Sequence, residues 1–173
     1  NSRVEFVYDY MGRRVQKIVS TYSAGAWSQD KEILYLYDGW NLVKETTIPD
    51  GASAVDKYYL WGLDLSQSLQ GAGGIGGLVA SVEGSLTYHY LYDANGNVGQ
   101  VVDASDGTIA AHYEYDPYGN EVLATGSLAA DNAYRFSTKY FDEETNLYYY
   151  GFRYFSSQIG RWINRDPSME QGG

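Results

Sequence analysis

Aromatic and apolar residues alternate with polar ones in several short segments, and most of these segments end at an aspartate. In segments such as Tyr90–Tyr92 and Tyr113–Tyr115, side chains two positions apart lie on one face of a strand. The aspartate that follows can accept a backbone N–H two residues further on and so start a turn. Glycine or asparagine three residues after it adopts the left-handed conformation at little cost. The pattern therefore predicts an outgoing strand, a tight turn and a return strand such as Val98–Val102.

This unit recurs along the chain, which indicates a repeat architecture. The four full copies are Phe6–Gly12, Tyr35–Asn41, Tyr90–Gly96 and Tyr113–Gly119. Two degenerate copies, Tyr59–Gly62 and Tyr148–Gly151, have Trp-Gly and Tyr-Gly in place of Tyr-Asp. We expect each copy to form a β-hairpin, with stacked tyrosines pairing across neighbouring strands.

Composition agrees with an all-β chain. There are 20 Gly and 19 Tyr but only 5 Phe among 173 residues, and no helical periodicity extends beyond about two turns. We expect the polar stretch from Thr46 to Asp56 to be a hairpin loop. Residues 125–133 read as a small-residue linker with room for a short helical turn.

The net charge of −10 argues against binding to nucleic acid or to an anionic membrane surface, and is typical of a soluble domain. The chain has no cysteine, which leaves the redox compartment open. No apolar stretch is long enough to span a bilayer. Because the chain opens directly on a strand and closes on Gly172-Gly173, we expect both ends to be cuts through a longer polypeptide.

Two further patterns suggest ligand sites, and both have a plainer interpretation. Gly71, Gly73 and Gly76 match the spacing G-x-G-x-x-G, but a strand rather than a helix follows, which favours a tight loop over a nucleotide site. His89 and His112 occupy the same slot of successive repeats and could share a metal. Equivalent slots hold Glu5 and Leu34, however, so we expect no metal and no cofactor.

The last segment from Tyr134 onward carries a family resemblance. Its motifs are Tyr134-Arg135-Phe136, Lys139-Tyr140-Phe141-Asp142, Thr145–Tyr150, Arg153-Tyr154-Phe155 and Gly160–Pro167. This segment resembles the repeat-associated core of Rhs/YD-repeat proteins, and the upstream Tyr-Asp units resemble YD repeats. The resemblance implies YD hairpins over residues 1–124 and a core segment over residues 125–173.

For fold and function, the resemblance implies a curved or spiralling antiparallel sheet that forms part of a hollow shell in a bacterial secreted or surface protein. The core segment would close one end of the shell as a plug. The implied partner is a C-terminal effector, or the remainder of the same polypeptide.

In several members of the family the core is an aspartic autoprotease that releases the downstream segment. Carried onto this chain, Arg165 and Asp166 match the Arg-Asp-Pro of the family's protease site, and the resemblance makes Asp166 the candidate catalytic carboxylate. An aspartic mechanism needs a second carboxylate that shares a proton with the first. The second carboxylate of the family pattern is not matched, because Glu170 is the only one in the following stretch.

Three alternatives remain open from the sequence. Asp166 could start a turn, or pair with Arg153 or Arg161, without any catalysis. The Tyr- and Trp-rich face could make the chain an adhesive module. Unpaired sheet edges could also join copies of the chain into oligomers or fibres. The arginines of the last segment, including Arg135, are expected to stack on aromatic rings as structural staples.

Overall fold

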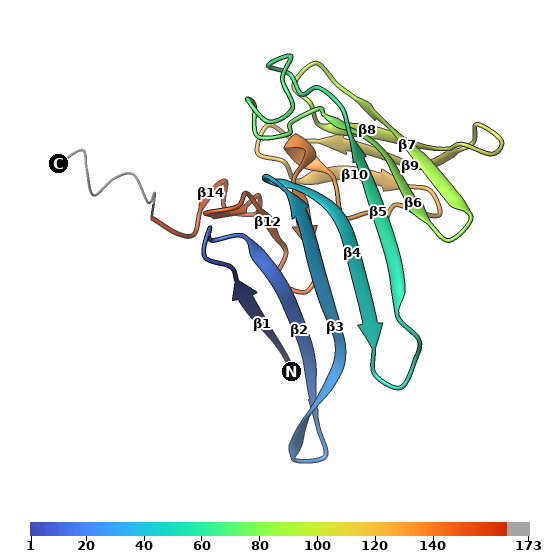
Figure 1. Ribbon diagram of the computed structural model, residues 1–173. Helices are drawn as coiled ribbons and strands as arrows, with labels where there is room; N and C mark the ends of the chain where they lie inside the picture. Colours follow the sequence, from blue (N-terminus) through green and yellow to red (C-terminus); the bar gives the residue numbers. More distant parts are fainter. Residues whose placement is uncertain (166–173) are drawn as a thin grey trace.

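The computed structural model describes residues 1–165, and these fold into two antiparallel sheets (Figure 1). The larger sheet has ten strands, each hydrogen-bonded to the next along the chain. Its strands are β1 (Ser2–Tyr8), β2 (Arg14–Ser23), β3 (Ala26–Asp38), β4 (Asn41–Pro49), β5 (Val55–Trp61), β6 (Leu78–Glu83), β7 (Leu86–Tyr92), β8 (Val98–Asp103), β9 (Ile109–Tyr115) and β10 (Glu121–Thr125). The prediction of an all-β antiparallel fold is confirmed.

The C-terminal segment forms a second, smaller sheet that packs against one face of the large one, coloured orange to red in Figure 1. A single 3-10 turn, η1 (Phe136–Thr138), precedes it. Its strands are β11 (Tyr140–Asp142), β12 (Leu147–Tyr149), β13 (Tyr154–Ser156) and β14 (Arg161–Trp162). The degenerate copy Tyr148–Gly151 lies here, so its hairpin belongs to the small sheet rather than to the large one.

The Tyr-Asp turns repeat almost atom for atom. Asp9, Asp93 and Asp116 each accept backbone N–H groups from the residues two and four positions further on, at 2.8–2.9 Å. The glycine three residues after each aspartate has a φ between +76° and +82°. The turn after Asp38 differs, because Asp38 pairs directly with Asn41 and leaves a two-residue loop. The left-handed residue is therefore Gly39, with φ +58°, and the prediction for Asn41 is wrong.

In each repeat of the large sheet, a β-bulge lies at the same place, at the start of the return strand. In five hairpins the return strand carries one extra residue just after its first inward-facing position, opposite the second aromatic of the repeat. These extra residues are Val15, Val43, Val79, Gly99 and Val122. Bulges bend a strand and increase its twist. Five of them in register therefore explain why the sheet curves along its length in Figure 1.

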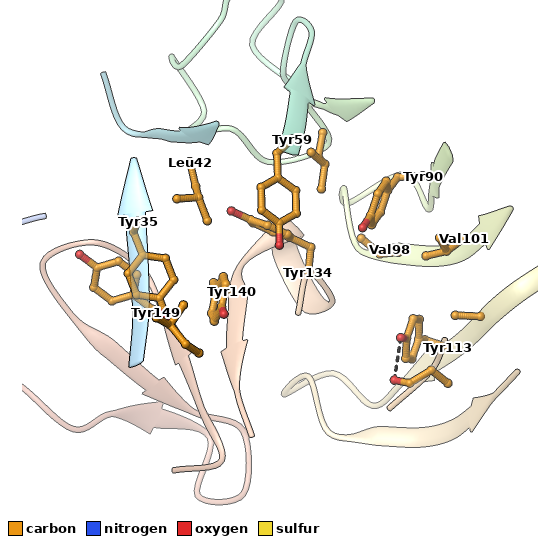
Figure 2. Packing of buried hydrophobic residues seen from close by; sticks show 14 residues of the cluster. Tyr35, Leu42, Tyr59, Tyr90, Val98, Val101, Tyr113, Tyr134, Tyr140 and Tyr149 are labelled. Carbon is orange, nitrogen blue, oxygen red and sulfur yellow. Dashed lines mark hydrogen bonds between the residues drawn. The ribbon is translucent and has the colours of Figure 1, made fainter. Parts of the chain in front are cut away.

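Tyrosines from alternate strands line the inner face of the curve (Figure 2). Tyr35, Tyr59, Tyr90 and Tyr113, the first aromatics of their repeats, are all buried, as the alternation predicts. They meet Tyr134, Tyr140 and Tyr149 of the C-terminal segment, and Tyr35 packs edge-on to Tyr140 with the ring centroids 5.7 Å apart. One core therefore joins the two sheets.

The second aromatic of the repeat has a separate task. Tyr115 Oη donates to the Val98 carbonyl at 2.9 Å, and Tyr92 donates in the same way to Leu78. Trp61 uses its indole Nε1–H toward the Leu42 carbonyl at 2.7 Å. Tyrosine and tryptophan both offer a ring with a donor at its tip. This shared donor explains why tryptophan can stand in the tyrosine slot.

The connecting segments are irregular. The glycine-rich stretch is a loop held by Asp64, whose carboxylate accepts the N–H groups of Ala72 at 2.7 Å and Gly74 at 3.1 Å. An added Cβ on Gly96 would lie 3.1 Å from the nitrogen of Gly76, so two backbones pass close together here. The loop after Thr46 is shorter than predicted, because β4 continues to Pro49 and β5 begins at Val55. Residues 126–133 form turns rather than a helix.

Candidate functional site

The candidate site is the interface between the two sheets, where buried charges and aromatic rings meet. One position of the repeat, which we call the slot, contributes to this interface in every copy within the large sheet. It is the first inward-facing residue after each turn, and it pairs with the second aromatic of the repeat. The middle repeats place apolar residues there, whereas the first and last place a charge. The five residues in the slot are Arg14, Leu42, Leu78, Val98 and Glu121. Both charged members point toward the C-terminal segment, which supplies an opposite charge for each.

Arg14 is fully buried and pairs with Asp142 of the small sheet. Its guanidinium carbon lies 4.5–5.0 Å from the ring centroids of Phe6, Tyr35, Tyr140 and Tyr149, two rings from each sheet. Burial alone would lower the pKa of Arg14, but the nearby Tyr35 and Asp142 outweigh it and raise the pKa above its usual value. Arg14 is therefore a permanent cation enclosed by aromatic faces.

A chain of ion pairs continues from Asp142 toward the surface. Lys17 Nζ lies 2.9 Å from the second oxygen of Asp142 and 2.9 Å from Glu144. Lys31 reaches the other oxygen of Glu144 at 2.7 Å. Burial would raise the pKa of Glu144, but the two lysines outweigh it and lower the pKa to about 2. Strands β2 and β3 of the large sheet are thus tied electrostatically to the end of β11 and to the loop that follows it.

Arg135 makes the matching connection at the other end of the large sheet. Its Nη1 lies 2.7 Å from Glu121 Oε1 on β10. Its remaining nitrogens donate to the carbonyls of Asn132 and Ala130, each at 2.8 Å. The guanidinium also lies 4.7 Å from the centroid of Phe141. The expectation that Arg135 acts as an aromatic staple is confirmed, and the ion pair with Glu121 adds a second role.

The two ion pairs can hold the small sheet in a single position against the large sheet. Removing one partner of a buried ion pair is strongly destabilising, by roughly 3–5 kcal/mol, because it leaves an uncompensated charge. An apolar interface alone would tolerate sliding, whereas two pairs at opposite ends of the sheet fix the register. The charged groups of the interface therefore serve to attach the small sheet to the large one.

Of the predicted catalytic residues, only Arg165 falls within the described part of the chain. Arg165 is exposed at the end of the described chain, after β14, and Asp166 and Glu170 lie outside the described residues. Arg153 stacks on Trp162 at 4.0 Å, as the staple interpretation predicts. Within residues 1–165, no group of three or more His, Asp or Glu side chains is arranged to hold a metal ion. His112 lies 3.4 Å from Glu114 instead.

Sequence reasoning missed Arg14, Lys17, Asp142 and Glu144. One signal was present, since Arg14 and Glu121 are charged where the other repeats have Leu or Val. Aligning the repeats from the turn onward, rather than on the Tyr-Asp pair alone, would have shown this. Nothing in the sequence pairs Arg14 with a residue 128 positions away.

Relatives of the chain are large proteins. It is 32% identical over 170 residues to the tRNA3(Ser)-specific nuclease WapA of Bacillus spizizenii. The matched region covers 97% of this chain and 6% of that protein. It is 52% identical over 40 residues to toxin subunit YenC1 of Yersinia entomophaga, covering 23% of this chain and 4% of the subunit. The chain thus spans less than a tenth of the length of these relatives, one of which is named as a nuclease and the other as a toxin subunit. No known protein-family profile matches the chain.

Solved structures show the same fold. A crystal structure of TcdB2-TccC3 without its hypervariable C-terminal region matches 95% of this chain and 8% of that chain, with a TM-score of 0.72 and 24% identity. A further TcdB2-TccC3 structure matches with a TM-score of 0.70 and 23% identity. At this identity the likeness concerns the fold, which is the curved β-sheet architecture described above.

In the described part of the chain, residues 1–165, no helix has the length and apolar character needed to cross a bilayer.

Proposed function

We propose that this chain is a structural segment of a YD-repeat, Rhs-type β-shell, in which residues 1–124 form wall and residues 125–173 form a core segment that plugs one end. The observation that carries the proposal is two ion pairs that attach the C-terminal segment to both ends of the repeat sheet. Arg14–Asp142 is fully buried, and Arg135–Glu121 is partly buried. A plug must stay in one place against a curved wall, and these pairs supply that constraint.

The repeat geometry supports the wall. Each hairpin adds two strands and one bulge, so curvature accumulates as hairpins are added. The inner face is aromatic and mostly buried by the small sheet, and the outer face carries the exposed middle residues of the repeats. Such a sheet can be extended at both ends without changing its design.

The proposed partner is a C-terminal effector, or the remainder of the same polypeptide, in a bacterial protein that is secreted or displayed at the cell surface. The relatives support this, since one is named as a nuclease and another as a toxin subunit, and this chain matches only a small part of each. The function of the segment is then enclosure rather than toxicity.

Protection of the downstream segment tests the shell proposal in the full-length parent protein. The variant Arg14→Met with Glu121→Gln breaks both attachments. We expect a protease to leave the downstream segment intact in the parent and to degrade it in the double variant. Lys57→Met is the control, because it removes the Lys57–Glu83 pair within the large sheet and should leave protection unchanged. Equal degradation of the parent and the double variant would contradict enclosure.

We propose as a second candidate function that Asp166, assisted by Arg165, cleaves the polypeptide downstream of this chain. The motif Arg165-Asp166-Pro167 favours it, at the position where the resemblance places a protease site. The test is the intact mass of a chain extended past Gly173 by its native continuation, beside the same chain with Asp166→Asn. Cleavage a few residues after Gly173 that is lost in the variant supports catalysis, and two uncut chains exclude it.

A further inference from the structure

An aromatic cavity lies between the two sheets, and its walls include Tyr140 and Tyr149, two of the rings that enclose Arg14. Its volume is about 260 Å³. Tyr37, Trp40 and Trp61 contribute walls from the large sheet and its turns, and Tyr134, Tyr150 and Phe152 contribute walls from the C-terminal segment. Trp40 and Phe152 pack against each other in its wall, with their ring centroids 4.6 Å apart. Small-molecule sites typically measure about 300–1,000 Å³, so this cavity is suited to one small planar ring system.

Among residues 1–165, Lys139 is the only charged residue that lines this cavity. Its ammonium donates to the Gly73 carbonyl at 2.5 Å and lies 5.3 Å from the centroid of Tyr150. An ammonium has three N–H donors, so two remain for a guest. Burial lowers the pKa of Lys139 to about 8, although Asp64 opposes the change. The group is therefore partly desolvated and gains more from an anionic partner than a surface lysine would.

Three other polar side chains of the cavity already have hydrogen-bond partners within the chain. Thr138 Oγ1 donates to the Gly96 carbonyl and accepts from Gly76, and Trp61 Nε1 donates to Leu42. Asn41 donates to the Leu69 carbonyl. In the part of the chain that the structure describes, no Asp or Glu lines the cavity, so a cationic guest would meet aromatic faces but also the ammonium of Lys139. Charge and shape together favour an anion carried on a flat ring.

We propose that this cavity is a binding site for a small aromatic carboxylate, whose ring stacks among Trp40, Trp61 and Phe152 and whose carboxylate contacts Lys139. The inference does not depend on the shell function, because it concerns a cavity complete within this chain. Loss of the shell function in the parent protein would leave it unchanged.

Two probes that share one ring test the site. Indole-3-acetate carries a carboxylate and tryptamine an ammonium on the same indole, and their binding to the 173-residue chain is measured by calorimetry at pH 7. We expect saturable binding of indole-3-acetate with a Kd below about 1 mM. We expect tryptamine to bind about ten-fold more weakly, since a charge-assisted contact is replaced by a repulsive one.

Lysine variants separate the site from general attraction. Lys139→Met should remove the preference for indole-3-acetate, whereas Lys139→Arg keeps the charge and should retain most of it. Lys44→Met is the matched control, because Lys44 pairs with Asp56 and does not line the cavity. The proposal is overturned if binding of indole-3-acetate does not saturate, or if the two probes bind equally well. It is also overturned if Lys139→Met, shown by thermal melting to be folded, still prefers indole-3-acetate to tryptamine.

Discussion

At the scale of single residues, the turn glycines carry two constraints that can be separated. Gly107 and Gly119 have almost the same left-handed backbone, with φ +76° and +82°. An added Cβ on Gly107 would meet nothing within 4 Å, whereas on Gly119 it would lie 2.5 Å from the Phe136 ring. The first glycine is needed for conformation only, and the second also for close packing against the C-terminal segment.

Alanine at these two positions should therefore have unequal effects. We expect Gly107→Ala to lower the free energy of unfolding by about 1 kcal/mol, the cost of a left-handed alanine. Gly119→Ala should lower it by roughly 2–4 kcal/mol, since crowding of Phe136 adds to that cost. Urea unfolding of both variants measures the difference. Equal losses would mean that the ring of Phe136 moves aside freely.

At the scale of the elements, the loop between β11 and β12 fastens the small sheet through Glu144. Its folded pKa of about 2 lies below the ordinary value of 4.5. Because the folded pKa is the lower one, the stabilisation is fully present above about pH 4.5 and is lost as the pH falls toward 2. Attachment of the small sheet should weaken over that range.

Glu144→Gln tests this pH dependence. We expect the variant to be less stable than the parent by roughly 2 kcal/mol at pH 7, after allowance for the partial exposure of the pair. The difference in the free energy of unfolding between parent and variant should shrink steadily as the pH falls from 4.5 to 2. Denaturant unfolding at several pH values measures it. Glu143→Gln is the matched control, since Glu143 is exposed and should give no such gap. A stability difference that does not change with pH would mean that Glu144→Gln disturbs packing rather than removing a charge interaction.

Strands and turns followed from the sequence because they depend on local chemistry. Alternation placed Tyr35, Tyr90 and Tyr113 on the inner face, and the Tyr-Asp pattern located three of the turns. The bulge after each turn was not predicted, since an extra residue such as Val15 is an ordinary strand former with no signature of its own. The pairing of Arg14 with Asp142 depends on how the C-terminal segment folds back, which local patterns do not encode.

At the scale of the whole molecule, the same slot of the repeat supplies both core residues and charged attachment residues. The middle repeats fill the slot after the turn with Leu42, Leu78 and Val98, which build the core shared with the C-terminal segment. The outer repeats place Arg14 and Glu121 there, where a purely apolar contact would fix the segment less well. One repeat unit therefore serves both as core and as attachment point, depending on a single residue.

The two ends of the large sheet lead to the last prediction. Within residues 1–165, β1 pairs only with β2 and β10 only with β9, so each has one side without a strand neighbour. Unpaired edges recruit other strands. We expect the chain to self-associate through them as its concentration rises, and sedimentation velocity measures this. A monodisperse monomer at high concentration would contradict the expectation.

Two lysine variants distinguish edge pairing from attraction between apolar faces. Val122 on β10 and Leu60 on the central strand β5 are almost equally exposed, at 64% and 62%. A charge on an edge strand opposes strand addition, whereas a charge on a central strand does not touch an edge. Val122→Lys should therefore shift the chain toward monomer, and Leu60→Lys should leave its association unchanged. If Leu60→Lys alone dissociates the oligomer, the exposed outer face rather than the sheet edge holds the copies together.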